Sequence, residues 1–254
     1  MEVHHHTHYP RKFKEYLQEF LMLFFAVFLG FMSEYYLEYR AERHKEHDYI
    51  NSMALDLKSD SVEMAIRMQG IESLKKMGKK LEKLLYKSEF SDDEIDSIYL
   101  LGTKITATII APNFSSGTID QLKNAGGYRL IKNQEIVRKI SDYDRWKNTI
   151  NLQEHLILNH YGNAHKMQNL LVHMTTIEKP EKFNEIILNK SELNRIAKMT
   201  GSKFLSTEKK VFYEYANYIW VLVGYVSYYE IMMKMQQENA SQLLKLIVAE
   251  LEHS

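Results

Sequence analysis

Apolar residues form one uninterrupted run near the start of the chain. Residues 20–33, FLMLFFAVFLGFMS, carry no charge, and as a helix they cover about 21 Å of the roughly 30 Å hydrocarbon core of a bilayer. The flanking Tyr16 and Tyr36 would lie about 30 Å apart on that helix, which matches the two interfacial belts of a bilayer. The pattern predicts a transmembrane signal anchor over residues 14–37, whose membrane-facing residues are Tyr16, Phe20, Phe24, Phe25, Phe28, Phe31 and Tyr36.

Three other interpretations of this run stay open. A cleaved signal peptide fits the basic start and the short apolar region, although residues 30–34 lack the small side chains of a cleavage site. An amphipathic surface helix needs a polar face, whereas this run is apolar around its whole circumference. A buried core helix of a soluble protein is the third interpretation, because the run has a suitable length for it.

Basic residues flank the run on both sides, three before it and three after it, so the positive-inside rule gives a tie. The first cluster, residues 11–14, directly precedes the apolar run and leaves little chain ahead of it to translocate. This arrangement is typical of a signal anchor. It favours a single-pass protein of the bacterial inner membrane with the bulk of the chain in the periplasm.

Helical periodicity continues beyond the anchor. No proline occurs from Glu38 to Lys87, and apolar residues recur with a period close to 3.5, which predicts a helical stalk over residues 38–87. Gly70 and Gly78 weaken an unbroken helix. The stripe fits a homo-oligomeric coiled coil. Packing against later helices of the same chain is the favoured interpretation, because those helices carry matching apolar faces.

Capping signals divide the rest of the chain into helices. They predict a helix over 91–110 that begins at Ser91, and a short helix over 118–125 with a Thr118–Gln121 capping box. A long helix is predicted over 134–174, after Asn133, and a last one from Ser206 or Thr207 nearly to the end. Two short helical pieces are predicted between 175 and 201. The predicted fold class is therefore all-α, with one N-terminal transmembrane helix continuing into a bundle of long helices over residues 38–254.

The composition excludes one fold class and several kinds of catalytic and binding chemistry. The chain has 254 residues with only 3 Pro and 10 Gly, which excludes a turn-rich β sandwich, and its lack of Cys excludes thiol nucleophiles and Cys-ligated metals. Lys and Arg total 33, as do Asp and Glu, so no bulk charge favours nucleic acid. Phosphate-loop and nucleophile-elbow motifs are absent from the sequence. We expect no catalytic residues, no cofactor and no nucleic-acid partner.

Histidine and tyrosine are the remaining candidates for binding chemistry. Within the predicted flexible tail, residues 1–13, His4, His5, His6 and His8 predict a weak, accessory metal affinity. Six tyrosines lie between residues 213 and 229, a density that suits a packed core whose hydroxyls find partners or a ligand-facing groove. A second transmembrane helix over this stretch is a further alternative.

Two stretches resemble an uncharacterised family of membrane-anchored proteins from the Bacteroidota: RKFKEYLQEFLMLFFAVFLGFMSEY, after a His-rich start, and SSGTIDQLKNAGGYRLIKNQEIVRKISDYD. The second holds a Leu-x-x-x-Gly-Gly-x-Arg-Leu-Ile turn, matched by Leu122, Gly126, Gly127, Arg129, Leu130 and Ile131. The resemblance implies that the histidines are native and that residues 14–37 are an anchor, and it implies no activity.

The residues of this turn also have a physical interpretation. Gly126 and Gly127 can supply the left-handed backbone that ends a helix, and Arg129 can pair with an acid on a neighbouring helix or bind an anionic ligand. Gly126, Gly127 and Arg129 are therefore predicted to form a structural turn at the centre of the bundle.

Together these patterns predict a non-enzymatic sensor, scaffold or assembly factor in the cell envelope. Its expected partners are the lipid bilayer, an envelope protein and, in the coiled-coil interpretation, a second copy bound through the stalk. The alternative is a ligand- or metal-binding sensor domain that uses the Tyr-rich helix face.

Overall fold

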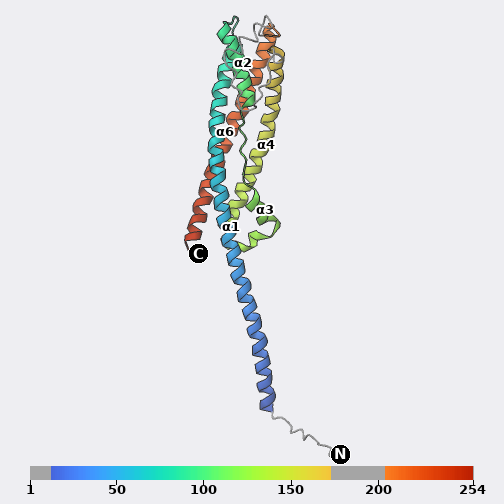
Figure 1. Ribbon diagram of the computed structural model, residues 1–254, viewed down its shortest axis with the longest axis vertical. Helices are drawn as coiled ribbons and strands as arrows, with labels where there is room; N and C mark the ends of the chain where they lie inside the picture. Colours follow the sequence, from blue (N-terminus) through green and yellow to red (C-terminus); the bar gives the residue numbers. More distant parts are fainter. Residues whose placement is uncertain (1–12, 173–203, 254) are drawn as a thin grey trace, which may run out of the picture.

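The computed structural model describes residues 13–172 and 204–253, and it confirms the predicted all-α class for them (Figure 1). The helices are α1 (Phe13–Leu85), α2 (Asp92–Ala107), α3 (Gly117–Asn124), the short 3-10 helix η1 (Gly127–Leu130), α4 (Gln134–Leu171) and α6 (Lys209–His253). The two short pieces predicted between 175 and 201 lie outside the described residues.

Helix α1 is one continuous helix of 73 residues with two environments. Its first part projects alone from the body of the molecule, and its second part packs lengthwise against α6, which in turn packs against α4 (Figure 1). Every buried residue of α1 lies between Ile50 and Leu85. The apolar stripe predicted for the stalk is thus buried within a single chain, mainly against α6 and α2.

Gly78 explains why α1 and α6 approach so closely. A Cβ atom at Gly78 would lie 2.4 Å from Cγ2 of Val223 on α6, a distance that real Cβ contacts do not reach. The glycine that weakens the helix in isolation therefore allows its tightest contact in the bundle, and α1 runs through it without a break.

Substituting Gly78 by alanine is expected to destabilise the bundle by about 1 to 2 kcal/mol, because the overpacking cost exceeds the gain in helix propensity. Adding Val223→Ala should restore most of that loss, since it removes the colliding methyl group. The control is Gly162→Ala in α4, where no atom lies within 4 Å and a gain of about 0.5 to 1 kcal/mol is expected. Urea unfolding of the three variants in detergent measures these changes in the free energy of unfolding. A Gly78→Ala protein that is more stable than wild type would contradict the close contact between Gly78 and Val223.

The capping predictions succeed at two helices and fail at a third. Ser91 and Glu94 form a complete capping box at α2, and the Asn133 side chain accepts hydrogen bonds from the backbone N–H of Glu135 and Ile136 at α4. The predicted Thr118 box is wrong, because α3 begins at Gly117 after Ser116 and Thr118 is buried in its first turn. The preceding loop is instead held by tertiary hydrogen bonds at Ser115.

A buried carboxylate links four segments of the bundle. Asp60 of α1 accepts hydrogen bonds of 2.7 Å from the Ser115 backbone N–H and 2.7 Å from the Tyr143 hydroxyl of α4. Gln236 of α6 in turn donates to the Tyr143 carbonyl at 3.0 Å. Burial, with Asp60 beside it, raises the pKa of Tyr143 far above its ordinary value, so the phenol stays a donor.

An ion pair joins α1 and α6 at a position on α1 beyond Asp60. Glu230 of α6 is bound by Lys234, at 2.7 Å on the same helix, and by Lys75 of α1. Hydrogen bonds from Lys234, and then from Lys75, hold the pKa of Glu230 below its ordinary value. A lowered folded-state pKa stabilises the fold above the unfolded value, and this contribution is lost as pH falls through the folded pKa.

We therefore expect wild type to exceed Glu230→Gln in unfolding free energy by about 1 kcal/mol near pH 7 and to lose that advantage near pH 3. Urea unfolding at both pH values measures the difference. Glu72→Gln is the control, because Glu72 pairs with Lys76 within one exposed turn and contributes little. An advantage that persisted unchanged at low pH would refute the role of this carboxylate.

Candidate functional site

The predicted anchor residues lie on the isolated part of α1. The seven residues are each 47 to 67% exposed: Tyr16, Phe20, Phe24, Phe25, Phe28, Phe31 and Tyr36. No residue of the apolar stretch that qualifies α1 as a candidate membrane span is buried against the bundle. The Phe24 ring stacks on those of Phe20 and Phe28, at centroid distances of 6.2 and 5.9 Å. The buried-core interpretation is therefore wrong, because this segment contacts no core.

Among the described helices, α1 alone is long and apolar enough to cross a membrane, and its apolar window lies near the N-terminus. This is consistent with a single-pass anchor. The alternative of a second span at the tyrosine-rich stretch of α6 is not supported, because Tyr215, Ile219 and Leu222 are fully buried in the bundle.

Just beyond the anchor, α1 binds the segment between η1 and α4. Arg43 donates to the Leu130 carbonyl at 3.1 Å and pairs with Glu46, and Glu46 accepts a hydrogen bond from the Lys132 backbone N–H. The Lys132 ammonium donates to the Tyr39 hydroxyl at 2.9 Å. That hydrogen bond and the lysine's charge lower the pKa of Tyr39. These contacts, which we name the basal clamp, fix the base of the bundle to the helix that carries the predicted anchor.

A groove of about 860 Å³ opens beside the basal clamp. It lies between α1, the residue before α4, and the last turn of α6, whose C-terminal end reaches the same level (Figure 1). Its charged and titratable lining residues are Arg40, Arg43, His44, Glu46, His47, Lys132 and Glu250. Sequence patterns did not relate the α1 part of this group to Lys132, because at least 82 positions, counted from Ile50 to Lys132, separate them.

The predicted glycine turn is present, but one of its roles differs. Gly126 has a φ of 65°, in the left-handed region, and Gly127 is buried so closely against Leu122 that a Cβ would lie 2.9 Å from its side chain. Arg129 is expected to pair with an acid or to bind an anion; its side chain is exposed and forms no ion pair with any described residue. The turn is held by Arg43 and Glu46 of the basal clamp instead.

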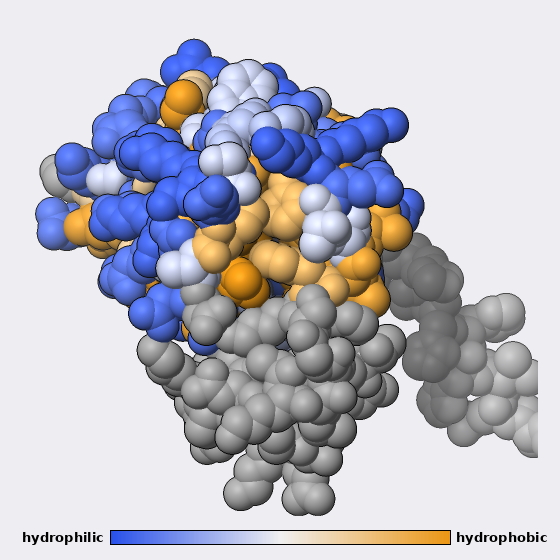
Figure 2. All heavy atoms as spheres, turned by 90° about the horizontal axis from the view of Figure 1, so that it is seen from above, coloured by the Kyte–Doolittle hydropathy of each residue, from blue (hydrophilic) through white to orange (hydrophobic). Residues whose placement is uncertain are grey.

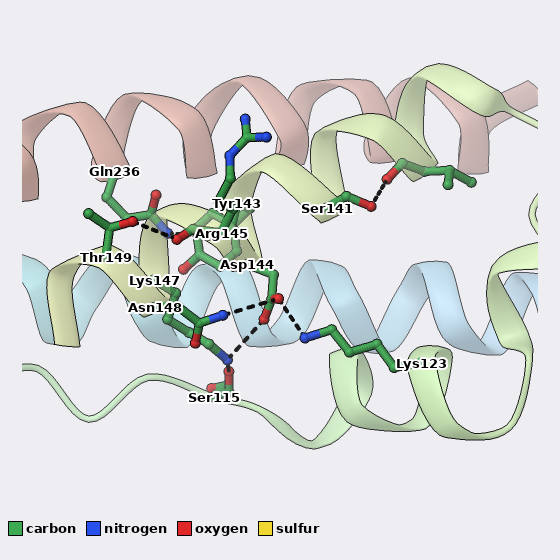
Figure 3. A network of polar contacts seen from close by, with 11 residues as sticks. Ser115, Lys123, Ser141, Tyr143, Asp144, Arg145, Lys147, Asn148, Thr149 and Gln236 are labelled. Carbon is green, nitrogen blue, oxygen red and sulfur yellow. Dashed lines mark hydrogen bonds and ion pairs between the residues drawn. The ribbon is translucent and has the colours of Figure 1, made fainter. Parts of the chain in front are cut away.

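A second, more polar cleft of about 480 Å³ lies between α4 and the loop before α3. Asp144 binds Lys123 of α3 and Asn148 of its own helix, and the nearly buried Lys147 donates to the Ser115 carbonyl at 3.1 Å (Figure 3). The Asp144 hydrogen bond raises the pKa of Lys123. Since Asp144 pairs with both Lys123 and Lys147, we assign this cluster to the stability of the fold.

The tyrosine-rich face of α6 divides into two sets. Tyr215 and Tyr229 are fully buried, and their hydroxyls have no hydrogen-bond partner among the described residues, contrary to the prediction that core hydroxyls find partners. Burial raises the pKa of both phenols. Tyr225 and Tyr228 instead line a shallow groove of about 350 Å³ with Trp220 and Gly224. This apolar groove has few polar groups to orient a ligand.

Aromatic residues also close the end of the bundle distal to the anchor. Phe212, in the first turn of α6, contacts Phe90 and Phe204 with ring centroids 5.2 and 5.3 Å away. Seen from above, apolar side chains gather at the centre of this end, with hydrophilic residues around part of its edge (Figure 2). The cluster seals the core where α1 ends and α6 begins.

The metal prediction concerns residues before the first described one. His4, His5, His6 and His8 lie outside the described residues, so their accessory affinity stays a prediction. Within residues 13–172 and 204–253, no group of three or more His, Asp or Glu side chains could hold a metal ion.

Comparison with known proteins adds no further assignment. No protein-family model, curated protein or solved structure matches this chain.

Proposed function

We propose that this chain is a single-pass, membrane-anchored helical bundle that acts as a non-enzymatic sensor, scaffold or assembly factor in the bacterial cell envelope. The observation that supports it is the continuity of α1, which runs without a break from an unburied apolar segment into the bundle core. A continuous helix, braced by the basal clamp, would transmit the position and tilt of the anchor to the bundle.

The proposal places the bulk of the chain in the periplasm, with the lipid bilayer and an envelope protein as partners. Fractionation of cells that produce the full chain tests the anchor: the protein should stay in the membrane pellet after alkaline carbonate and dissolve only in detergent. A protein that is soluble without detergent would refute the proposal.

A reporter fused after Ser254 tests the sidedness separately. Alkaline phosphatase, which is active only in the periplasm, should be active in the fusion, whereas green fluorescent protein exported through the same pathway should be dark. The opposite pair of results would place the bundle in the cytoplasm while leaving the anchor intact.

The alternative function is a sensor that binds a ligand on the tyrosine-rich face. One observation favours it, the groove beside Trp220 and Tyr228, whose side chains are 64 and 56% exposed. A ligand that binds the folded state should raise the unfolding temperature of the full chain, and Trp220→Ala should remove that rise. Aromatic metabolites are the probes to screen; a rise that survives Trp220→Ala would place their binding elsewhere.

A further inference from the structure

The groove at the base of the bundle has an uneven distribution of charge. On α1, the residues that line it at i, i+3, i+4 and i+7 are Arg40, Arg43, His44 and His47. Glu38 and Glu42 of the same segment do not line it, because they lie on other faces of the helix. Over these two turns of α1, the one acidic side chain that lines the groove is thus the clamp residue Glu46, against four with basic or titratable nitrogen groups.

The acids that do line the groove are already occupied. Glu46 is neutralised by Arg43 and also accepts the Lys132 backbone N–H, and Glu250 accepts a 2.7 Å hydrogen bond from the Asn133 amide. Arg40 and Lys132, by contrast, are exposed, and their side chains donate to the hydroxyls of Tyr36 and Tyr39. Among the described residues, neither cation has a carboxylate partner.

Their height above the anchor adds a second constraint. Arg40 follows Tyr36 by four residues, about 6 Å along the helix axis, and the headgroup layer of a bilayer is itself about 5 to 8 Å thick. Lys132 reaches the same level from the segment between η1 and α4, because its ammonium lies 4.9 Å from the centre of the Tyr39 ring. If residues 14–37 span the bilayer, both cations lie in the headgroup layer.

We propose that this groove binds the phosphate-bearing headgroup of an anionic phospholipid between Arg40 and Lys132. The proposal rests on the proposed anchor, and it adds a lipid preference to it. The basal clamp holds the Lys132 ammonium in place as a donor, and the acyl chains of the lipid would lie along the aromatic surface of α1. Binding there would stabilise the contact between α1, η1 and α4.

The test is a titration of the full chain in detergent, with the rise in unfolding temperature as the measure of binding. Phosphatidylglycerol is expected to saturate at a much lower concentration than phosphatidylcholine. Arg40→Gln with Lys132→Gln should weaken phosphatidylglycerol binding by roughly thirtyfold, since each basic residue at an anionic surface contributes about 1 kcal/mol. Arg40→Lys with Lys132→Arg keeps both charges and should retain binding.

The matched control is Lys79→Gln with Lys80→Gln, two exposed cations on the bundle part of α1 that carry the same total charge. It should bind phosphatidylglycerol like wild type. Equal binding of both lipids, or an equal loss in the control, would overturn the proposal. Inorganic phosphate that protects as well as the lipid would overturn the lipid assignment. Because the titration is done in detergent, its outcome is independent of the fractionation that tests the anchor.

Discussion

Replacing Phe24 and Phe28 with lysine is expected to remove the full chain from the membrane fraction. Both rings lie at the middle of the unburied apolar segment. A lysine at the centre of a transmembrane helix costs about 2.5 to 3.5 kcal/mol on the insertion scale, so the pair costs about 5 to 7 kcal/mol. Because the apolar run is already shorter than the bilayer core, it has no additional apolar residues whose burial in lipid could offset this cost.

Carbonate extraction followed by immunoblotting measures the distribution between pellet and supernatant. The control is Leu55→Lys with Val62→Lys, which changes two exposed apolar residues in the bundle part of the same helix. The control protein should stay in the pellet, because only the position of the added charge differs. If Phe24→Lys with Phe28→Lys stayed there as well, residues 14–37 would not be the anchor.

Asp60→Ala is expected to have the largest effect on the stability of the bundle, a loss of about 3 to 5 kcal/mol. The substitution leaves two buried donors without an acceptor, the Ser115 backbone N–H and the Tyr143 hydroxyl. Each unsatisfied buried group costs about 1 to 3 kcal/mol, and a small cavity adds to this. The loss should loosen α1, the loop before α3, α4 and α6 together.

Urea unfolding of the detergent-solubilised chain, followed by circular dichroism, measures this loss. Tyr143→Phe removes one of the two hydrogen bonds and should cost less, about 1 to 2 kcal/mol. Asp48→Ala, an exposed aspartate on the same helix, should change stability by no more than about 0.5 kcal/mol. An Asp60→Ala protein as stable as the Asp48→Ala protein would show that the buried hydrogen bonds contribute nothing net.

A local signal for Asp60 exists in the sequence. It follows Leu57 by three residues and precedes Met64 by four, so a carboxylate stands inside the apolar stripe of α1. A charged residue at a core position needs partners, which indicates a polar contact with another segment. The partners themselves, Ser115 and Tyr143, have no such signal, because nothing in their own segments relates them to Asp60.

The sequence by itself determined the all-α class, the apolar segment that can form an anchor, and the caps at Ser91 and Asn133. These features depend on helical periodicity and on hydrogen bonds within four residues, which the local sequence can specify. The glycine turn is also predictable from the local sequence, since glycine adopts the left-handed backbone conformation found at Gly126 without steric cost.

Only the tertiary structure decided which residues meet across the bundle. Arg43 binds a carbonyl 87 residues away, Asp60 a hydroxyl 83 residues away, and Lys75 a carboxylate 155 residues away. Such contacts depend on the relative rotation and height of whole helices, which follow from packing along their entire length. For that reason the basal groove and the close passage at Gly78 emerge only when the helices are assembled.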